Sequence, residues 1–150
     1  MKRDLPAESD TQKLAEDVYT SLADDYAGWL ILLSGDLGAG KSTFARAFLK
    51  AAGHRGAVPS PTYTLVEPYD LPPGSIYHID LYRLSSPDEL QYLGWDELEQ
   101  SLRLVEWPDR APGIEAQADL LIHLAYRGTG RTVEITAFSE RGQSLIQKIN

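Results

Sequence analysis

Hydrophobic residues in the first part of the chain follow first a helical and then a strand-like pattern. An apolar residue falls at every fourth position, at Leu14, Val18, Leu22 and Tyr26. This spacing predicts an amphipathic helix that ends near Tyr26, and a capping box formed by Ser9 and Gln12 is expected to begin it. The uninterrupted apolar run 29–34 then predicts a central parallel strand that is buried on both faces.

The same alternation continues along the rest of the chain. A second helix, ended by Gly53, is predicted by the apolar face Phe44, Ala47, Phe48 and Ala51. Apolar or alternating runs predict strands at 63–69, 75–81, 102–107, 119–126 and 132–138. Further helical segments are expected after a cap at Ser86, at 96–101, and from Ser139 onward. Tight turns at 71–74 and 127–131 would join neighbouring strands, and the segment 56–64, with two prolines, is expected to be a loop.

Helices that alternate with buried strands are typical of the α/β class. We therefore expect a central sheet that is mostly parallel, with antiparallel strands at its edges. The sequence contains no internal repeat, low-complexity tract or long linker, and its 150 residues are an ordinary length for one domain. Residues 1–150 are accordingly predicted to form a single domain.

One motif carries most of the chemical information. The segment 35–42, Gly-Asp-Leu-Gly-Ala-Gly-Lys-Ser, fits the P-loop pattern and lies between a predicted buried strand and a predicted helix. Its glycines allow the torsions that turn successive N–H groups around an anion, and the helix N-terminus adds free donors. Lys41 can reach the β- and γ-phosphates of a nucleotide, and the Ser42 hydroxyl can hold Mg²⁺. The motif predicts a three-layer P-loop nucleotide-binding fold.

Two carboxylates stand where catalysis with Mg²⁺ needs them, at the carboxyl ends of buried strands. Asp80 and Glu106 each follow an apolar, strand-like run. Either could hold Mg²⁺ or orient the attacking water, and the residues alone leave these two roles open. Thr62 could cap the γ-phosphate as switch loops do, or it could be an ordinary turn threonine. The candidate catalytic residues are Lys41, Asp80, Glu106 and Thr62.

Other noticeable side chains have plainer expected roles. Trp107 is expected to pack in the core, and His78 to be a hydrogen-bonded structural residue. A solvated helix face is expected from four basic residues, Arg46, Lys50, His54 and Arg55. No arginine stands out as one that would stabilise a transferring phosphate, although Arg83 and Arg103 lie near the acids in the sequence.

Charge and composition narrow the classes of protein. The chain has 14 basic and 22 acidic residues and a formal net charge of −8, which argues against a direct grip on nucleic acid. With no cysteine, disulfides and thiol catalysis are excluded. The apolar runs fall far short of the roughly 20 residues that a membrane helix needs, and residues 1–25 lack a signal-peptide pattern. We expect a cytoplasmic protein. A base-reading Asn-Lys-x-Asp stretch of GTPases is absent, since Asn150 is the sole asparagine, so ATP is favoured.

Four separate segments carry a resemblance to a known family. They are residues 35–43, Ser-Pro-Thr-Tyr at 60–63, His-Ile-Asp-Leu-Tyr-Arg-Leu at 78–84, and Val-Glu-Trp-Pro at 105–108. In this order they resemble the bacterial TsaE (formerly YjeE) family, the small ATPases of tRNA threonylcarbamoyladenosine biosynthesis. The resemblance spans about residues 9–110, and beyond Pro112 only the strand–strand–helix outline is similar.

The resemblance implies a role for each matching residue. ATP phosphates would bind at Gly38, Ala39, Gly40, Lys41, Ser42 and Thr43. Mg²⁺ would bind Ser42 and Glu106, with Asp80 near the metal or the attacking water and Thr62 in a switch-like loop. Thr11 would lie near the adenine. Ser42 stands where threonine is common in the family, and both residues present a hydroxyl to Mg²⁺.

The resemblance also implies partners. Family members act with the TsaD and TsaB proteins, which install threonylcarbamoyl on an adenosine of tRNA, and ATP hydrolysis would reset that complex between turnovers. The expected function is therefore a slow, Mg²⁺-dependent ATPase that meets tRNA only through the complex. The motif also allows a small-metabolite kinase, although the stretch between Arg110 and Arg127 has no Arg or Lys for a basic lid. A nucleotide-sensing interaction module without turnover is the third hypothesis.

Overall fold

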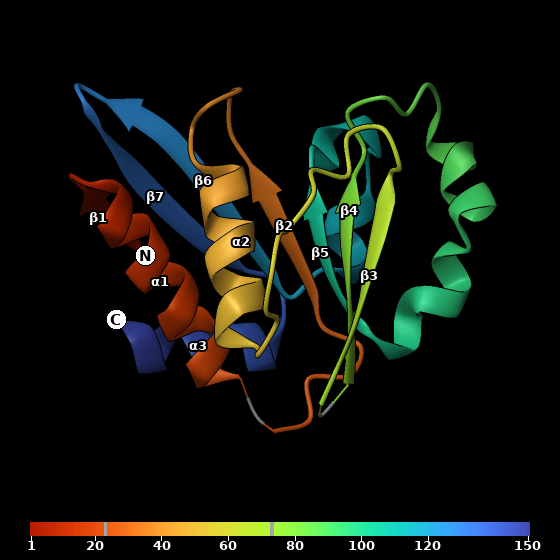
Figure 1. Cartoon of the computed structure of the whole chain (residues 1–150), viewed down its shortest axis with the longest axis horizontal. Coiled ribbons are helices and arrows are strands. Elements are labelled where there is room, and N and C mark those ends of the chain that lie inside the picture. The colour runs from red at the N-terminus through yellow and green to blue at the C-terminus, as the bar shows by residue number, and fades with distance from the viewer. Residues whose placement is uncertain (23, 73) are drawn as a thin grey trace.

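The computed structural model describes residues 1–22, 24–72 and 74–150, and in these ranges a seven-stranded sheet forms its centre (Figure 1). The spatial order of the strands is β1-β7-β6-β2-β5-β4-β3. They are β1 (Lys2–Leu5), β2 (Leu30–Ser34), β3 (Val66–Leu71), β4 (Gly74–Asp80), β5 (Leu102–Glu106), β6 (Leu120–Arg127) and β7 (Gly130–Ala137).

The sheet is mixed rather than mostly parallel. The four central strands β6, β2, β5 and β4 run parallel to one another. The pairings β3–β4, β6–β7 and β1–β7 are antiparallel. The predicted parallel centre and the predicted antiparallel edge strands are both present, and with three antiparallel pairings the sheet as a whole is mixed. The reason is local, because short turns can join only antiparallel neighbours, and two such hairpins plus β1 extend both edges.

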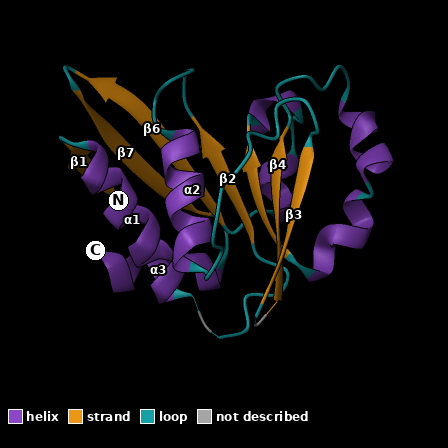
Figure 2. Ribbon diagram, in the orientation of Figure 1, coloured by secondary structure: helices purple, strands orange, loops and turns teal. Residues whose placement is uncertain are grey.

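In the described part of the chain, three α-helices cover one face of the sheet and short 3₁₀ helices cover the other (Figure 2). The α-helices are α1 (Glu8–Ser21), α2 (Lys41–Ala51) and α3 (Glu140–Ile149). The 3₁₀ helices are η1 (Pro87–Leu93), η2 (Trp95–Gln100), η3 (Pro108–Arg110) and η4 (Ile114–Gln117). The fold is α/β, with an outer layer of 3₁₀ turns in place of α-helices on one side. Within the same ranges, no helix is long and apolar enough to cross a membrane.

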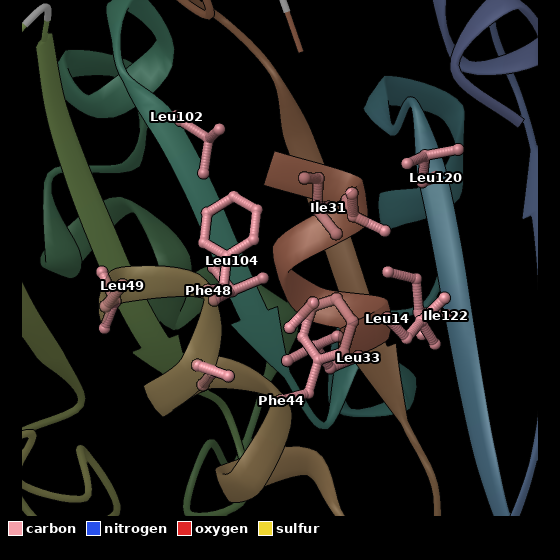
Figure 3. Packing of buried hydrophobic residues seen from close by; sticks show 14 of the residues in the cluster. Leu14, Ile31, Leu33, Phe44, Phe48, Leu49, Leu102, Leu104, Leu120 and Ile122 are labelled. Carbon is pink, nitrogen blue, oxygen red and sulfur yellow. The ribbon is translucent and has the colours of Figure 1, made fainter. Parts of the chain in front are cut away.

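The strand β2 separates two hydrophobic clusters, one on each face. Leu30 through Leu33 have no exposed surface, so the prediction of a strand buried on both faces is confirmed. On the α-helical face, side chains from α1, α2 and three strands pack together: Leu14, Ile31, Leu33, Phe44, Phe48, Leu104 and Ile122 (Figure 3). On the other face, Leu30 and Leu32 pack with Trp95 and Ile114. Each such side chain stabilises the fold by about 1.5–3 kcal/mol when fully buried.

The first helix differs from its predicted bounds at both ends. The predicted cap at Ser9 is wrong, because the helix begins at Glu8 and the Asp10 carboxylate accepts a hydrogen bond from the backbone N–H of Ala7 at 2.8 Å. The helix ends at Ser21 rather than near Tyr26. Tyr26 is instead buried beyond it, where its hydroxyl donates to the carbonyl of Gly74 at 2.7 Å.

The remaining predictions meet the structure with mixed success. The edge strand β1 was not predicted, and the segments expected as helices after Ser86 and at 96–101 are 3₁₀ helices. The caps themselves are confirmed, since the hydroxyls of Ser86 and Ser139 accept from backbone N–H groups of Asp88 and Gly142. Of the predicted turn 71–74, Pro73 lies outside the described residues, as does one residue of the predicted first helix, Ala23.

Candidate nucleotide and metal site

The glycine-rich segment 35–40 connects β2 to α2 and turns tightly. Gly35, Gly38 and Gly40 have φ values of 143°, 83° and 115°, which only glycine adopts without strain. Gly40 occupies the N-cap of α2 in the left-handed region. Because it brings no side chain, the first N–H groups of the helix remain open toward the loop. A strand, a glycine-rich turn and a helix N-terminus in this order form a backbone arrangement that can bind an anion.

The hairpin β6–β7 supports this segment from behind. The Tyr126 hydroxyl donates to the carbonyl of Leu37 at 2.8 Å, and the Arg131 guanidinium donates to the carbonyl of Gly38 at 3.1 Å. The guanidinium also lies over the Tyr126 ring, 4.2 Å from its centroid. A Cβ atom on Gly38 would overlap the Tyr126 hydroxyl. The hairpin therefore fixes the loop from a distant part of the sequence.

Lys41 is folded back into the loop. Its ammonium group donates to the carbonyl of Gly35 and, at 3.2 Å, to that of Asp36. It also lies over the Trp107 ring, 4.1 Å from the centroid. Only 5% of the residue is exposed, and this burial lowers the pKa of the amine even though the carboxylates of Glu106 and Asp80 act in the opposite direction. The ammonium group is thus held by the loop carbonyls at the predicted phosphate site.

The two predicted carboxylates lie side by side. Asp80 ends β4 and Glu106 ends β5, and they are direct partners in the parallel register. Asp80 accepts hydrogen bonds from the Tyr82 N–H at 2.8 Å and from the Thr62 hydroxyl at 2.9 Å. Glu106 Oε2 lies 2.6 Å from Nε2 of buried His78. Both carboxylates are buried, at 3% and 5% exposure, and one oxygen or more of each is held in place by these partners.

These groups line one cavity of about 210 Å³. Its walls include Gly38, Gly40, Lys41, Ser42, Thr43, Thr62, Asp80, Glu106 and Trp107. The structure therefore brings together the predicted catalytic residues and the predicted hydroxyl of Ser42. Ala39 lines neither this cavity nor the next, since it is fully buried and its N–H donates to the carbonyl of Asp36 at 3.0 Å.

A second cavity of about 250 Å³ adjoins the first. The two share Gly38, Gly40 and Thr43. Thr11 of α1 and Arg131 of β7 also line the second cavity. Thr11, predicted to lie near an adenine, therefore lines the cavity next to the predicted phosphate site.

The donor set fits Mg²⁺. A serine hydroxyl and two carboxylates are the hard oxygen ligands that this ion prefers, and it usually keeps several waters and phosphate oxygens as its other ligands. Among the described residues no group of three or more His, Cys, Asp or Glu side chains forms a complete metal cage. An ion held partly by phosphate is compatible with this arrangement.

Four side chains contribute to the site beyond the predicted set: His78, Trp107, Tyr126 and Arg131. Neither candidate arginine reaches the site. Arg103 is 4% exposed, lies over the ring of Trp95 and pairs in register with Leu30, three residues before Glu106. Arg83 lies over the ring of Tyr63 and lines neither cavity. The neighbours Glu106-Trp107 were visible in the sequence, but the other contacts depend on long-range pairing.

The fold and the site together define an α/β protein in which a glycine-rich loop, its lysine and two strand-end carboxylates share one cavity. Sequence comparison then gives the particular family. The chain belongs to the family of the threonylcarbamoyl adenosine biosynthesis protein TsaE, whose profile matches residues 5–133. The resemblance seen in the four motifs is confirmed.

Individual relatives support the same assignment. The tRNA threonylcarbamoyladenosine biosynthesis protein TsaE of Haemophilus influenzae is 43% identical over 119 residues, which cover 78% of this chain and 75% of the relative. The protein of the same name from Aquifex aeolicus is 41% identical over 108 residues, or 71% of this chain and 75% of the relative. A solved structure described as "Crystal structure of Bacillus subtilus YdiB" has a TM-score of 0.75 and 28% identity, covering 99% of this chain and 93% of that chain.

Proposed function

We propose that this chain binds ATP with Mg²⁺ and hydrolyses it as the ATPase component of the tRNA threonylcarbamoyladenosine machinery. The observation that carries the proposal is the convergence of Lys41, Ser42, Asp80 and Glu106 on one cavity at the start of α2. Membership of the TsaE family supplies the pathway. In this proposal residues 1–150 act as one P-loop ATPase domain in the cytoplasm.

The two adjoining cavities fit the two ends of a nucleotide. The triphosphate would lie along residues 38–43, where backbone N–H groups and the positive end of the α2 dipole favour negative charge. The adenosine would lie in the second cavity, beside Thr11 and Arg131. Lys41 would then leave the carbonyls of Gly35 and Asp36 and donate to the β- and γ-phosphate oxygens.

Hydrolysis needs a positioned water and stabilised charge. Bound Mg²⁺ supplies neutralisation of the charge that develops on the phosphate oxygens. Ser42 and Glu106 are the residues that would hold it, with Asp80 beside the metal or the water. The Thr62 hydroxyl, now on Asp80, is within the same cavity and would cap the γ-phosphate. Burial of both carboxylates keeps them oriented and excludes bulk water from the reacting centre.

The proposal includes partners. We assign to the chain the TsaD and TsaB proteins as partners, and contact with tRNA only through them, because the net charge of −8 disfavours a direct grip. An arginine that stabilises the transferring phosphate is absent from the cavity lining. A partner protein could supply such a group in trans, as activating proteins do for other nucleotide hydrolases.

Phosphate release from ATP tests the function. We expect slow, Mg²⁺-dependent release by the chain alone and faster release with TsaD and TsaB present. Lys41→Ala should lower it by about 100-fold or more, as the loss of a preorganised electrostatic contact does. Lys148→Ala, which removes an exposed lysine on α3, is the matched control and should change nothing.

Other results would redirect the assignment. Activity that survives Lys41→Ala would come from a contaminant. No phosphate release with both partners present would contradict the hydrolase and favour a nucleotide-sensing module. Phosphate transferred to a metabolite instead of water would favour a kinase.

A further inference from the structure

A groove separate from the nucleotide cavities runs between α1 and α2. It has a volume of about 600 Å³ and is open to solvent along its length. Its lining comes from the two helices and the segment that follows α2: Gln12, Glu16, Thr20, Thr43, Arg46, Ala47, Lys50, Ala51, His54, Gly56, Ala57 and Val58. Of the residues that line this groove, the family motifs and the proposed chemistry use only Thr43.

The groove carries cations that form no ion pair within the described residues. Arg46 and Lys50 are exposed and stand one helical turn apart on α2, and Arg55 follows directly after His54 of the lining. Among the arginines and lysines of the described ranges, these three form no hydrogen bond, ion pair or contact over an aromatic ring. Glu16 is the one acid of the lining, and it lies beyond ion-pair distance of them.

Exposed cations elsewhere on the molecule have partners. Lys13 lies 2.8 Å from Asp17, and Arg127 lies 3.1 Å from Asp4. The unpaired state of the groove cations is therefore a local property and does not follow from a shortage of acids in a chain with 22 of them.

The groove is already shaped. Ala47 and Ala51 provide small side chains on its α2 wall, so the helix backbone lies close to an entering ligand. His54 Nε2 lies 3.0 Å from the carbonyl oxygen of Ala57, and the rings of His54 and Tyr69 form a T-shaped pair with their centroids 4.7 Å apart. Val58 packs against the main hydrophobic cluster. The wall formed by the segment after α2 is therefore already ordered before a ligand binds.

We propose that this groove docks an acidic segment of a partner protein, placing two or three carboxylates against Arg46, Lys50 and Arg55. The volume lies within the usual range of ligand sites, about 300–1,000 Å³, and suits the side chains of a short peptide. A nucleic acid fits less well, because its affinity depends on many cations that neutralise phosphates and the chain as a whole has a net charge of −8. Unpaired charges that meet their complement set the partner and its orientation.

The place of the groove links docking to the nucleotide. Thr43 lines the groove and also both nucleotide cavities. A partner seated here would contact the same helix, α2, whose first turn is proposed to hold the phosphates. This inference rests on the proposed function for the identity of the partners, TsaD and TsaB.

Charge reversal tests the docking surface. The affinity of the full chain for the TsaB–TsaD pair is measured by isothermal titration at two salt concentrations, for the wild type and for Arg46→Glu/Lys50→Glu. We expect binding weaker by on the order of tenfold or more, because like charges are then opposed, together with a smaller salt dependence. Phosphate release from ATP by the chain alone should stay unchanged. The variant Arg46→Gln/Lys50→Gln removes the two positive charges of α2 without introducing negative ones. It should weaken binding by a smaller factor.

A matched control and the remaining outcomes complete the test. Lys2→Glu/Lys148→Glu shifts the net charge by the same amount outside the groove and should bind as the wild type does. Unchanged affinity of the groove variants, or an equal loss in the control, overturns the proposal. A loss of tRNA binding by the chain in place of partner binding overturns it in favour of a nucleic-acid surface. A wild-type chain that hydrolyses ATP but binds neither partner overturns both the docking surface and the partnership, and leaves the hydrolase standing.

Discussion

The contact between His78 and Glu106 shows how a residue behind the cavity can determine the geometry within it. The two side chains are 3% and 6% exposed and lie 2.6 Å apart. With Oε2 of Glu106 held by the imidazole, Oε1 is left for the cavity. Nδ1 of His78 has no partner among the described residues, so the carboxylate contact is what defines the ring's orientation. Such supporting contacts hold metal-binding carboxylates in place.

Replacing His78 should therefore disturb Mg²⁺ use before it disturbs the fold. His78→Phe fills the space without a donor, and we expect the Mg²⁺ concentration needed for half-maximal phosphate release to rise by about 10–100-fold. His78→Gln can still donate to Glu106 and should restore part of this loss. Binding of Mn²⁺ in the presence of ADP, followed by electron paramagnetic resonance, reports the same affinity without turnover. Equal metal affinity in wild type and His78→Phe would reduce His78 to a packing residue.

Asp119 is a second residue whose hydrogen bonds have measurable consequences. Its carboxylate accepts from Arg141 at 2.8 and 2.9 Å, from the Ser139 hydroxyl at 2.7 Å and from the Leu30 N–H at 3.0 Å. Burial acts to raise the pKa of Asp119, but the hydrogen bonds, led by those from Arg141, outweigh it and hold the pKa below its ordinary 3.8. The ionised form is thus favoured in the folded state.

The sign of this shift predicts a pH dependence. A depressed folded-state pKa contributes stability above the ordinary pKa of the carboxyl, and the contribution is lost as the pH falls through the folded value. Asp119→Asn should cost about 1–3 kcal/mol at neutral pH. Urea unfolding at a series of pH values should show the gap between wild type and variant closing below about pH 4. A gap that is constant across this range would assign the cost to packing alone.

At this scale, local motifs were predictable and long-range contacts were not. Lys41, Ser42, Asp80 and Glu106 follow from strand ends and a contiguous loop, so the sequence places them together. His78 meets Glu106 only because β4 and β5 pair in one particular register, which no short pattern specifies.

Among the elements, the loop 35–40 packs closely against the backbone of strand β6. A Cβ atom on Gly35 would overlap the backbone carbonyl of Leu124, which cannot move without shifting the strand. Gly53 also has a positive φ, 108°, but a Cβ atom there would meet nothing within 4 Å. Both glycines thus have a positive φ, but only Gly35 also lies too close to a neighbouring backbone for a side chain.

The comparison of Gly35→Ala with Gly53→Ala tests the contact between the loop 35–40 and strand β6. Both variants should lose about 1–2 kcal/mol of unfolding free energy from the positive φ alone. Gly35→Ala should lose more, and it should also bind ATP weakly because the loop can no longer lie against β6. Urea unfolding and ATP titration measure the two effects. Normal ATP binding by Gly35→Ala would show that the loop tolerates displacement from the strand.

The elements that escaped prediction share a physical reason. The strand β1 is a short segment of four residues in which Leu5 is the one buried apolar side chain, and its pairing with β7 defines it. The first helix begins two residues earlier than a cap at Ser9 implies, because the Asp10 carboxylate accepts from the N–H of Ala7, which is the N-cap. The 3₁₀ helices carry good capping signals, but tertiary packing decides between 3₁₀ and α geometry.

Across the whole molecule, the two faces of the sheet are protected unequally. Among the described residues, one face is covered by three α-helices and the larger hydrophobic cluster, and the other by 3₁₀ turns and a smaller cluster. Isolated 3₁₀ turns have poorer hydrogen-bond geometry than α-helices. In η1 no residue is buried, and its Tyr92 is 88% exposed.

Hydrogen exchange should reveal this asymmetry. We expect backbone amides of η1 and η2 to exchange through local opening, at least about 100-fold faster than those of β2, β5 and α2, which should exchange only through global unfolding. Mass spectrometry of peptides from both faces makes the comparison within one sample. Equal protection of η1 and α2 would mean that the sheet, the α-helices and the 3₁₀ helices unfold as one cooperative unit.

Because Lys41 is folded back onto the loop, its existing contacts would compete with a phosphate for the same position. In the proposed function, an incoming phosphate would displace the Lys41 ammonium group from two carbonyls and from the face of Trp107, so binding would begin with an exchange of partners. A small inorganic anion offers one new contact in return and leaves two carbonyls unpaired. In the proposed function, a nucleoside triphosphate would make additional contacts along the adjoining cavity, which would offset that loss. We therefore expect the position of Lys41 to favour a whole nucleotide over inorganic phosphate.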